Sequence, residues 1–63
     1  MTFAEMMQDC QRKHWEVRIS MSSRGLTTVE IIANNTGYYG DDGDYESSMT
    51  QAYLDAIAGE EPD

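Results

Sequence analysis

Residues 15–33 read WEVRISMSSRGLTTVEIIA, and this stretch decides the fold. Polar and apolar residues alternate in its first half, where one face is formed by Trp15, Val17, Ile19 and Met21. Alternation with a period of two is typical of a strand that is buried on one face. The second half alternates again, with Thr27, Val29, Ile31 and Ala33 on one face. The tetrapeptide 22–25 ends in Gly25, which adopts a positive φ without steric cost, so the stretch is predicted to form a β-hairpin.

A helix is predicted on each side of this hairpin. Residues 2–13 are predicted to be helical, and an apolar stripe at helical spacing runs along them to the next residue, formed by Phe3, Met6, Met7, Cys10 and His14. Thr2 and Glu5 have the spacing of a capping box. Residues 45–58 carry a second stripe, formed by Tyr45, Met49, Ala52, Tyr53, Ala56 and Ile57. Asp44 or Ser47 is expected to cap this helix, and Gly59 to lie just beyond its end.

Residues 34–44 connect the hairpin to the second helix. Residues 34–37 are predicted to form a turn, Tyr38-Tyr39 a short third strand that ends at Gly40, and residues 41–44 a loop. The predicted fold is α+β, a small antiparallel sheet of two to three strands with two helices, in the order α-β-β-(β)-α. We expect a single domain over residues 1–59 and an acidic tail over residues 60–63. The open face of the sheet should then show Glu16, Arg18, Ser20, Thr28, Glu30 and Ile32.

Charge divides the chain at Gly25. All 4 basic residues precede Gly25, while nine of the 12 acidic residues follow it, within a net charge of −8. A field of one sign repels nucleic acid and anionic membranes, and it attracts basic protein surfaces. We therefore expect no direct binding of nucleic acid or membrane, and a basic protein as the partner.

Length and composition exclude several classes of protein. A chain of 63 residues has a marginal core and little room for a concave active site. The single cysteine, Cys10, cannot form an internal disulfide, which favours a reducing compartment. There is no signal peptide and no apolar run of membrane-spanning length, so an intact cytosolic product is expected. Neither Cys10 nor His14 lies in a catalytic pattern, and we expect neither enzymatic activity nor a cofactor.

The densest feature is the acidic segment that contains Asp41, Asp42, Asp44 and Glu46. One interpretation is a solvated turn that caps the second helix, because acids favour helix N-termini. A calcium loop is a poor alternative, since Met49 stands where the EF-hand pattern needs an acid, six residues after Gly43. The other strong interpretation is phosphate mimicry, in which carboxylates imitate the charges along a nucleic-acid backbone.

Three tyrosines flank the acidic segment: Tyr38, Tyr39 and Tyr45. They either close the edge of the core or form a contact surface, because tyrosine is enriched at binding hot spots. If Tyr38 and Tyr39 lie in a strand, one of them must point away from the core.

The predicted order of elements is similar to that of a double-stranded-RNA-binding domain. That module contacts phosphates and needs basic residues at the start of its last helix. Here that position holds the acidic residues 41–46, so RNA binding is not expected.

In its overall character the chain resembles small phage-encoded inhibitors of the anti-CRISPR and DNA-mimic type, which are single-domain, cytosolic, strongly acidic and free of catalytic motifs. The resemblance implies a stoichiometric binder that blocks a basic nucleic-acid-binding protein of the bacterial host, acting as a monomer or weak homodimer. The expected contact residues are the four acids and three tyrosines named above: Asp41, Asp42, Asp44, Glu46, Tyr38, Tyr39 and Tyr45. The alternative is a phage structural or accessory module that contacts its partner, or a second copy, through the open sheet face or a free sheet edge.

Overall fold

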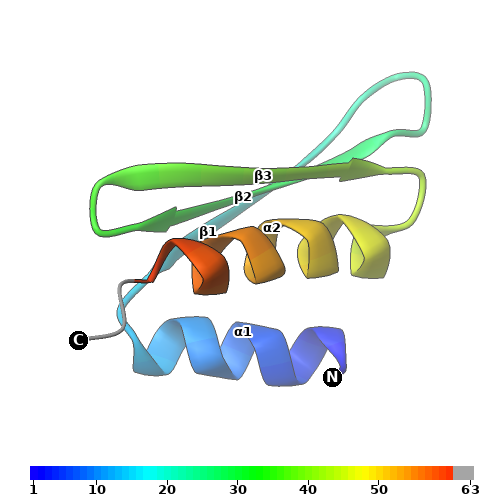
Figure 1. The fold of residues 1–63 in the computed structure, drawn as a ribbon. Coiled ribbons are helices and arrows are strands. Elements are labelled where there is room, and N and C mark those ends of the chain that lie inside the picture. Colours follow the sequence, from blue (N-terminus) through cyan, green and yellow to red (C-terminus); the bar gives the residue numbers. More distant parts are fainter. Residues whose placement is uncertain (61–63) are drawn as a thin grey trace.

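The computed structural model describes residues 1–60 of the chain. Along these residues run α1 (Phe3–Arg12), β1 (Glu16–Met21), β2 (Thr27–Ala33), β3 (Thr36–Asp42) and α2 (Tyr45–Gly59). The strands form one antiparallel sheet in the order β1-β2-β3, so β1 and β3 are its two edges. Both helices lie on the same side of this sheet (Figure 1). The predicted α+β fold is confirmed, with a complete third strand.

The start of α1 is the predicted capping box. The backbone N–H of Thr2 donates to Glu5 Oε1 at 2.8 Å, and the N–H of Glu5 donates to Thr2 Oγ1 at 3.2 Å. Two of the N–H groups that have no partner inside the helix are satisfied in this way, which fixes where α1 begins.

The end of α1 differs from the prediction. The spacing predicts His14 on the apolar stripe, but His14 is exposed and has a left-handed φ of 62°. Its N–H donates to the carbonyl of Gln11 at 3.1 Å, and the N–H of Trp15 donates to the carbonyl of Cys10 at 2.9 Å. These two bonds form a Schellman motif, in which the residue after the C-cap takes the left-handed conformation. The motif ends the helix and turns Trp15 into the core.

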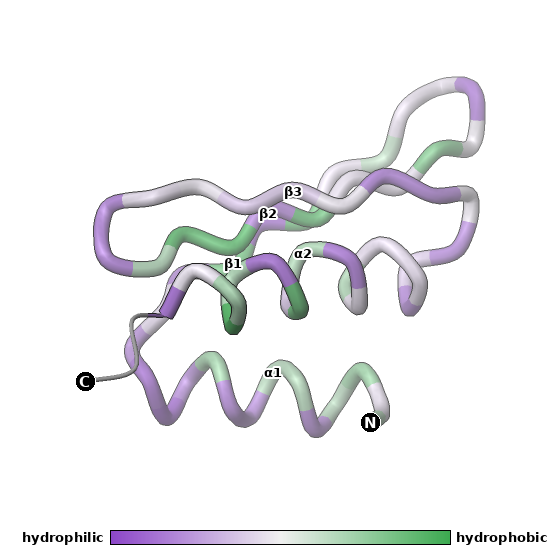
Figure 2. Tube along the Cα trace, viewed as in Figure 1, coloured by the Kyte–Doolittle hydropathy of each residue, from purple (hydrophilic) through white to green (hydrophobic). Residues whose placement is uncertain are grey.

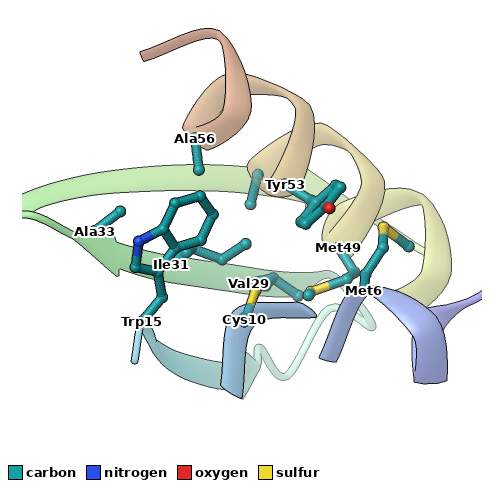
Figure 3. Close-up of a cluster of buried hydrophobic side chains, with 10 residues drawn as sticks. Met6, Cys10, Trp15, Val29, Ile31, Ala33, Met49, Tyr53 and Ala56 are labelled. Atoms are coloured by element: carbon teal, nitrogen blue, oxygen red, sulfur yellow. The ribbon is translucent and has the colours of Figure 1, made fainter. Parts of the chain in front are cut away.

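The core lies between the sheet and the two helices (Figure 3). Every second residue of β2 is buried, as predicted, because β2 is the central strand and α2 covers it. The helices contribute the rest of the core, and Trp15 closes one end with 8% of its surface exposed. The buried apolar residues are Met6, Cys10, Trp15, Val29, Ile31, Ala33, Met49, Ala52, Tyr53 and Ala56.

β1 is far less buried than predicted. Ile19 and Met21 pair with Val29 and Thr27 and share their face of the sheet, yet they are 47% and 77% exposed. The hairpin of β1 and β2 projects away from the helices at its turn, so neither helix covers this part of β1 (Figure 1). Leu26, just after the turn, is exposed as well. The alternation in the sequence therefore predicted which side chains of β1 face the helices, but not whether a helix covers them.

β3 is longer than predicted because Gly40 lies inside the strand. Gly40 is buried, and a Cβ atom there would lie 1.9 Å from the backbone oxygen of Ser48 in α2. Glycine therefore allows strand and helix to touch rather than ending the strand. The turn before β3 is also shorter than predicted: Asn34 and Asn35, with φ of 53° and 65°, alone join Ala33 to its partner Thr36. This is the conformation of a two-residue type I′ hairpin.

The predicted tail is described only at its first residue. Glu60 caps the C-terminus of α2, and its carboxylate accepts a hydrogen bond from Lys13 Nζ at 2.9 Å. Residues 61–63 of that tail lie outside the described residues. Gly59 was predicted to follow α2 but is its last helical residue, without a positive φ.

Candidate functional site

The four carboxylates singled out in the sequence lie where β3 ends and α2 begins. Asp41 and Asp42 are the last residues of β3, so the predicted loop over residues 41–44 is reduced to Gly43 and Asp44. Figure 2 shows hydrophilic residues running from the end of β3 into this turn. We call Asp41, Asp42, Asp44 and Glu46 the acidic end.

Because Asp41 and Asp42 are neighbours in a strand, they point to opposite faces of the sheet. Asp41 faces the open side, where its Oδ1 accepts a hydrogen bond from Thr28 Oγ1 at 2.6 Å. Asp42 faces the helices, where its Oδ2 accepts from Gln51 Nε2 at 3.4 Å and its Oδ1 from the N–H of Asp44 at 3.3 Å. Both side chains are therefore held in place by hydrogen bonds.

Asp44 is the N-cap of α2. Its Oδ2 accepts hydrogen bonds from the N–H and the hydroxyl of Ser47, each at 3.2 Å. Glu46 lies exposed in the first turn of the same helix. Acids in these positions interact favourably with the helix dipole, so the interpretation as a helix-capping turn is confirmed for Asp44. This structural role leaves the charge of Asp44 in place.

No basic side chain among residues 1–60 forms an ion pair with the acidic end. Arg12 and Lys13 pair with Asp9, and Lys13 also pairs with Glu60. Arg18 pairs with Glu16 at 2.6 Å. α1 and α2 run in the same direction, so their C-terminal ends lie together, joined by the hydrogen bond between Lys13 and Glu60. Both helices begin at the opposite side of the molecule, where the acidic end lies (Figure 1). The acidic end therefore has no ion-pair partner within the described residues and lies away from Arg12 and Lys13.

The three tyrosines do not gather on one surface. Tyr39 is exposed on the open face and donates a hydrogen bond to Glu30 Oε2 at 2.8 Å, which raises the pKa of Tyr39. Tyr45, also exposed, packs edge-on against Phe3 with 5.1 Å between ring centroids. Tyr38 is half-buried and packs against the core. Only Tyr39 and Tyr45 are therefore free to contact a partner through most of their rings.

Two side chains near the acidic end were not predicted as part of the site. Gln51 of α2 reaches over the edge of β3, where its Oε1 accepts the backbone N–H of Asp41 at 3.2 Å. Glu30 stands beside Tyr39 on the open face and adds a carboxylate to it. The alternation of β2 already placed Glu30 on that face. Gln51 carried no signal, because its role depends on how α2 crosses β3.

One further polar cluster joins the two helices. The hydroxyl of Tyr53 donates a hydrogen bond to Asp9, which also pairs with Arg12 and Lys13. The hydrogen bond raises the pKa of Tyr53 to about 12 and lowers the pKa of Asp9. This cluster fixes α1 against α2.

Residues 1–60 show neither a pocket nor a set of side chains that would hold a metal ion. None of the helices in this part of the chain is long and apolar enough to span a membrane. Comparison with protein-family models, with curated proteins and with solved structures finds no match to this chain. The candidate site is thus a charged surface with two exposed tyrosines beside it.

Proposed function

We propose that this protein is a non-enzymatic inhibitor of the anti-CRISPR type, made by a phage and acting in the cytoplasm of its host. In this proposal the acidic end docks onto the basic surface with which a bacterial protein or complex binds nucleic acid. The inhibitor then occupies the place of the nucleic acid without being altered itself.

The observation that carries the proposal is that no basic side chain of residues 1–60 forms an ion pair with the acidic end. Three of the 4 basic residues are engaged in ion pairs with Asp9, Glu16 and Glu60, which leaves the carboxylates of the acidic end available to an external cation. Duplex DNA likewise presents fixed negative charges to the basic side chains of its partners. A basic groove is therefore the kind of surface that complements this part of the molecule.

Preorganisation adds to this argument. Asp41, Asp42 and Asp44 are each held by a hydrogen bond from Thr28, Gln51 or Ser47. Side chains that are already ordered lose little conformational entropy when they bind. Tyr39 and Tyr45 supply exposed aromatic surface beside the carboxylates, and aromatic side chains of this kind contribute strongly at interfaces.

The first experiment captures the partner. The tagged protein is incubated with a bacterial lysate that has been treated with nuclease, and bound proteins are eluted first with duplex DNA or RNA and then with salt. The proposal expects a nucleic-acid-binding protein that nucleic acid displaces competitively. Capture only of proteins that nucleic acid does not displace would contradict it, as would a mobility shift of DNA or RNA by the protein itself at physiological salt.

The second experiment tests the acidic end with the captured partner. Asp41→Asn combined with Glu46→Gln removes two charges there and leaves the cap residue Asp44 intact. The control, Glu16→Gln combined with Asp55→Asn, removes two exposed charges outside the acidic end. We expect only the first variant to associate more slowly at low salt, with the difference narrowing as salt is added. Equal rates for the two variants would show that the acidic end is not the binding site.

A second candidate function is a structural or accessory module of a phage particle. The observation in its favour is the exposed apolar surface of Ile19, Met21 and Leu26 on the projecting hairpin. Assembly through that surface would persist at high salt, whereas binding through the acidic end would weaken.

A further inference from the structure

The free edge of β1 is a second surface, separate from the acidic end. Ser22 closes the hairpin by donating its N–H to the carbonyl of Leu26 at 2.8 Å, which makes these two residues a hydrogen-bonded pair. In an antiparallel ladder such pairs alternate along the strand. The backbone groups of Ser20, Arg18 and Glu16 therefore point toward β2, and those of Val17, Ile19 and Met21 point outward. No other strand of residues 1–60 pairs with that edge.

The two edges of the sheet are protected to different degrees. Edge strands usually avoid association through charged residues, proline, bulges or coverage by another element. β3 ends in two aspartates, and Gln51 occupies the outward N–H of Asp41. β1 has no proline and an unbroken register with β2 over Glu16–Met21, and its two charged residues, Glu16 and Arg18, pair with each other on the open face. Its outward residues Ile19 and Met21 are instead large, apolar and exposed.

We propose that β1 pairs antiparallel with β1 of a second copy of this chain, with Ile19 opposite Ile19 across a twofold axis. The pairing joins two three-stranded sheets into one sheet of six strands with all four helices on one side. It places Met21 of each copy opposite Val17 of the other, and so covers the most exposed apolar side chain of the strand. Because the pattern is symmetric about Ile19, the surface is complementary to itself, as a twofold interface requires.

Charge favours a second copy at this edge over the acidic end. The chain carries −8, so two copies repel each other wherever their acids meet. At β1 the only acid is Glu16, and it is paired with Arg18 of the same strand. In the proposed register Arg18 lies opposite Ser20 of the second copy, so no like charges oppose each other directly. The acidic ends belong to β3 and α2 and stay free in both copies.

The expected affinity is modest. A standard interface buries about 800 Å² per partner, which is close to a fifth of the 4364 Å² that this chain exposes. A strand of six residues covers less than that. We therefore expect dissociation at a concentration between about 10 µM and about 1 mM. Salt should strengthen the dimer because it screens the repulsion between the two acidic bodies, whereas binding through the acidic end should respond to salt in the opposite direction.

The test is sedimentation equilibrium of the purified chain from about 1 µM to about 1 mM, at low and high salt. The wild type is expected to pass from monomer to dimer, at lower concentration in high salt. Ile19→Lys sets two lysines opposite each other and should weaken the dimer at least about tenfold. Leu54→Lys is the matched control, because Leu54 of α2 is 59% exposed but lies outside the interface. A wild type that stays monomeric in high salt would overturn the proposal, as would equal dimerisation of both variants.

Two further measurements keep the test independent of folding defects in the lysine variant. Ile19→Cys should form a disulfide-linked dimer on mild oxidation, whereas Leu54→Cys should not, because only residue 19 meets itself across the axis. Amide exchange at Ile19 should slow as the wild-type concentration rises, while exchange at Tyr39 on the other edge should not. A dimer in which exchange at Ile19 is independent of concentration would show that another surface pairs.

Discussion

Replacing Gly40 by alanine tests the close contact between β3 and α2. The added Cβ atom would lie 1.9 Å from the carbonyl oxygen of Ser48, 2.9 Å from the backbone nitrogen of Ala52 and 2.9 Å from the Cβ atom of Gln51. Two of these three atoms belong to the backbone of α2, so relief requires the whole helix to move away from the sheet. The core beneath it would then lose its close packing.

The cost can be set against the stability of so small a domain. Overpacking of this kind costs about 3 kcal/mol, reduced by about 0.5 kcal/mol because alanine restricts the unfolded chain more than glycine does. A core of this size supplies about 4 kcal/mol in total. The ratio of folded to unfolded molecules would therefore fall from about 900 to about 13. The melting temperature should drop by about 10–20 °C.

Gly37→Ala is the control within the same strand. The nearest atoms to its added Cβ are the ends of flexible side chains on the open face, Glu30 Oε2 at 3.2 Å and the Tyr39 hydroxyl at 3.4 Å. These can move, so we expect a change within about 0.5 kcal/mol. Thermal unfolding of both variants is followed by circular dichroism and by Trp15 fluorescence. If Gly40→Ala has the same melting temperature as Gly37→Ala and the wild type, the close approach of α2 to β3 does not constrain this fold.

Three other residues give predictions of the same kind. Trp15→Ala should cost about 3–5 kcal/mol and leave the chain largely unfolded by circular dichroism, since Trp15 is buried; near-native melting would refute this. His14→Gly should stabilise by about 1 kcal/mol in urea unfolding, because glycine adopts the left-handed φ of 62° without strain and the exposed imidazole has no partner to lose. The hydrogen bond from Tyr53 to Asp9 lowers the pKa of Asp9, so its contribution to the free energy of unfolding is lost as pH falls below 3.8. The same bond raises the pKa of Tyr53 to about 12, so that contribution is also lost as pH rises from 10 to 12. Tyr53→Phe should accordingly be less stable than the wild type at neutral pH and converge with it at both extremes, whereas a constant difference would show that the hydrogen bond is not the cause.

Local signals in the sequence predicted most of the fold. The capping box of Thr2 and Glu5 and the alternation of β2 are consequences of neighbouring residues, and the structure confirms them. The stripe of α2 is confirmed from Met49 onward, whereas Tyr45, predicted to begin it, is exposed. The errors arose where distant elements meet. The sequence suggested that Gly40 ends the third strand and that Gly59 follows the second helix. Gly40 instead lies inside β3, where it allows α2 to pack closely, and Gly59 is the last residue of α2.

The sequence indicated which acids lie close together in the chain, but not how the fold arranges their side chains. A run of acidic residues indicates a concentration of negative charge. The direction in which each carboxylate points depends on where β3 ends. Because β3 continues to Asp42, adjacent carboxylates are divided between two faces of the sheet, and Tyr38 is turned toward the core while Tyr39 is exposed. The exposure of Ile19 and Met21 could not be predicted either, since alternation does not say how far a helix extends beneath a strand.

The rate at which a reagent labels the Cys10 thiol can report on local opening of the native protein. The thiol of Cys10 in α1 is fully buried in the core, and burial raises its pKa, so a thiol reagent can react only after the core around Cys10 has opened. Asp9 is the adjacent residue that ties the helix to Tyr53. The labelling rate of the wild type therefore reports how often Cys10 becomes exposed. Labelling that is faster than global unfolding would show that α1 detaches by itself.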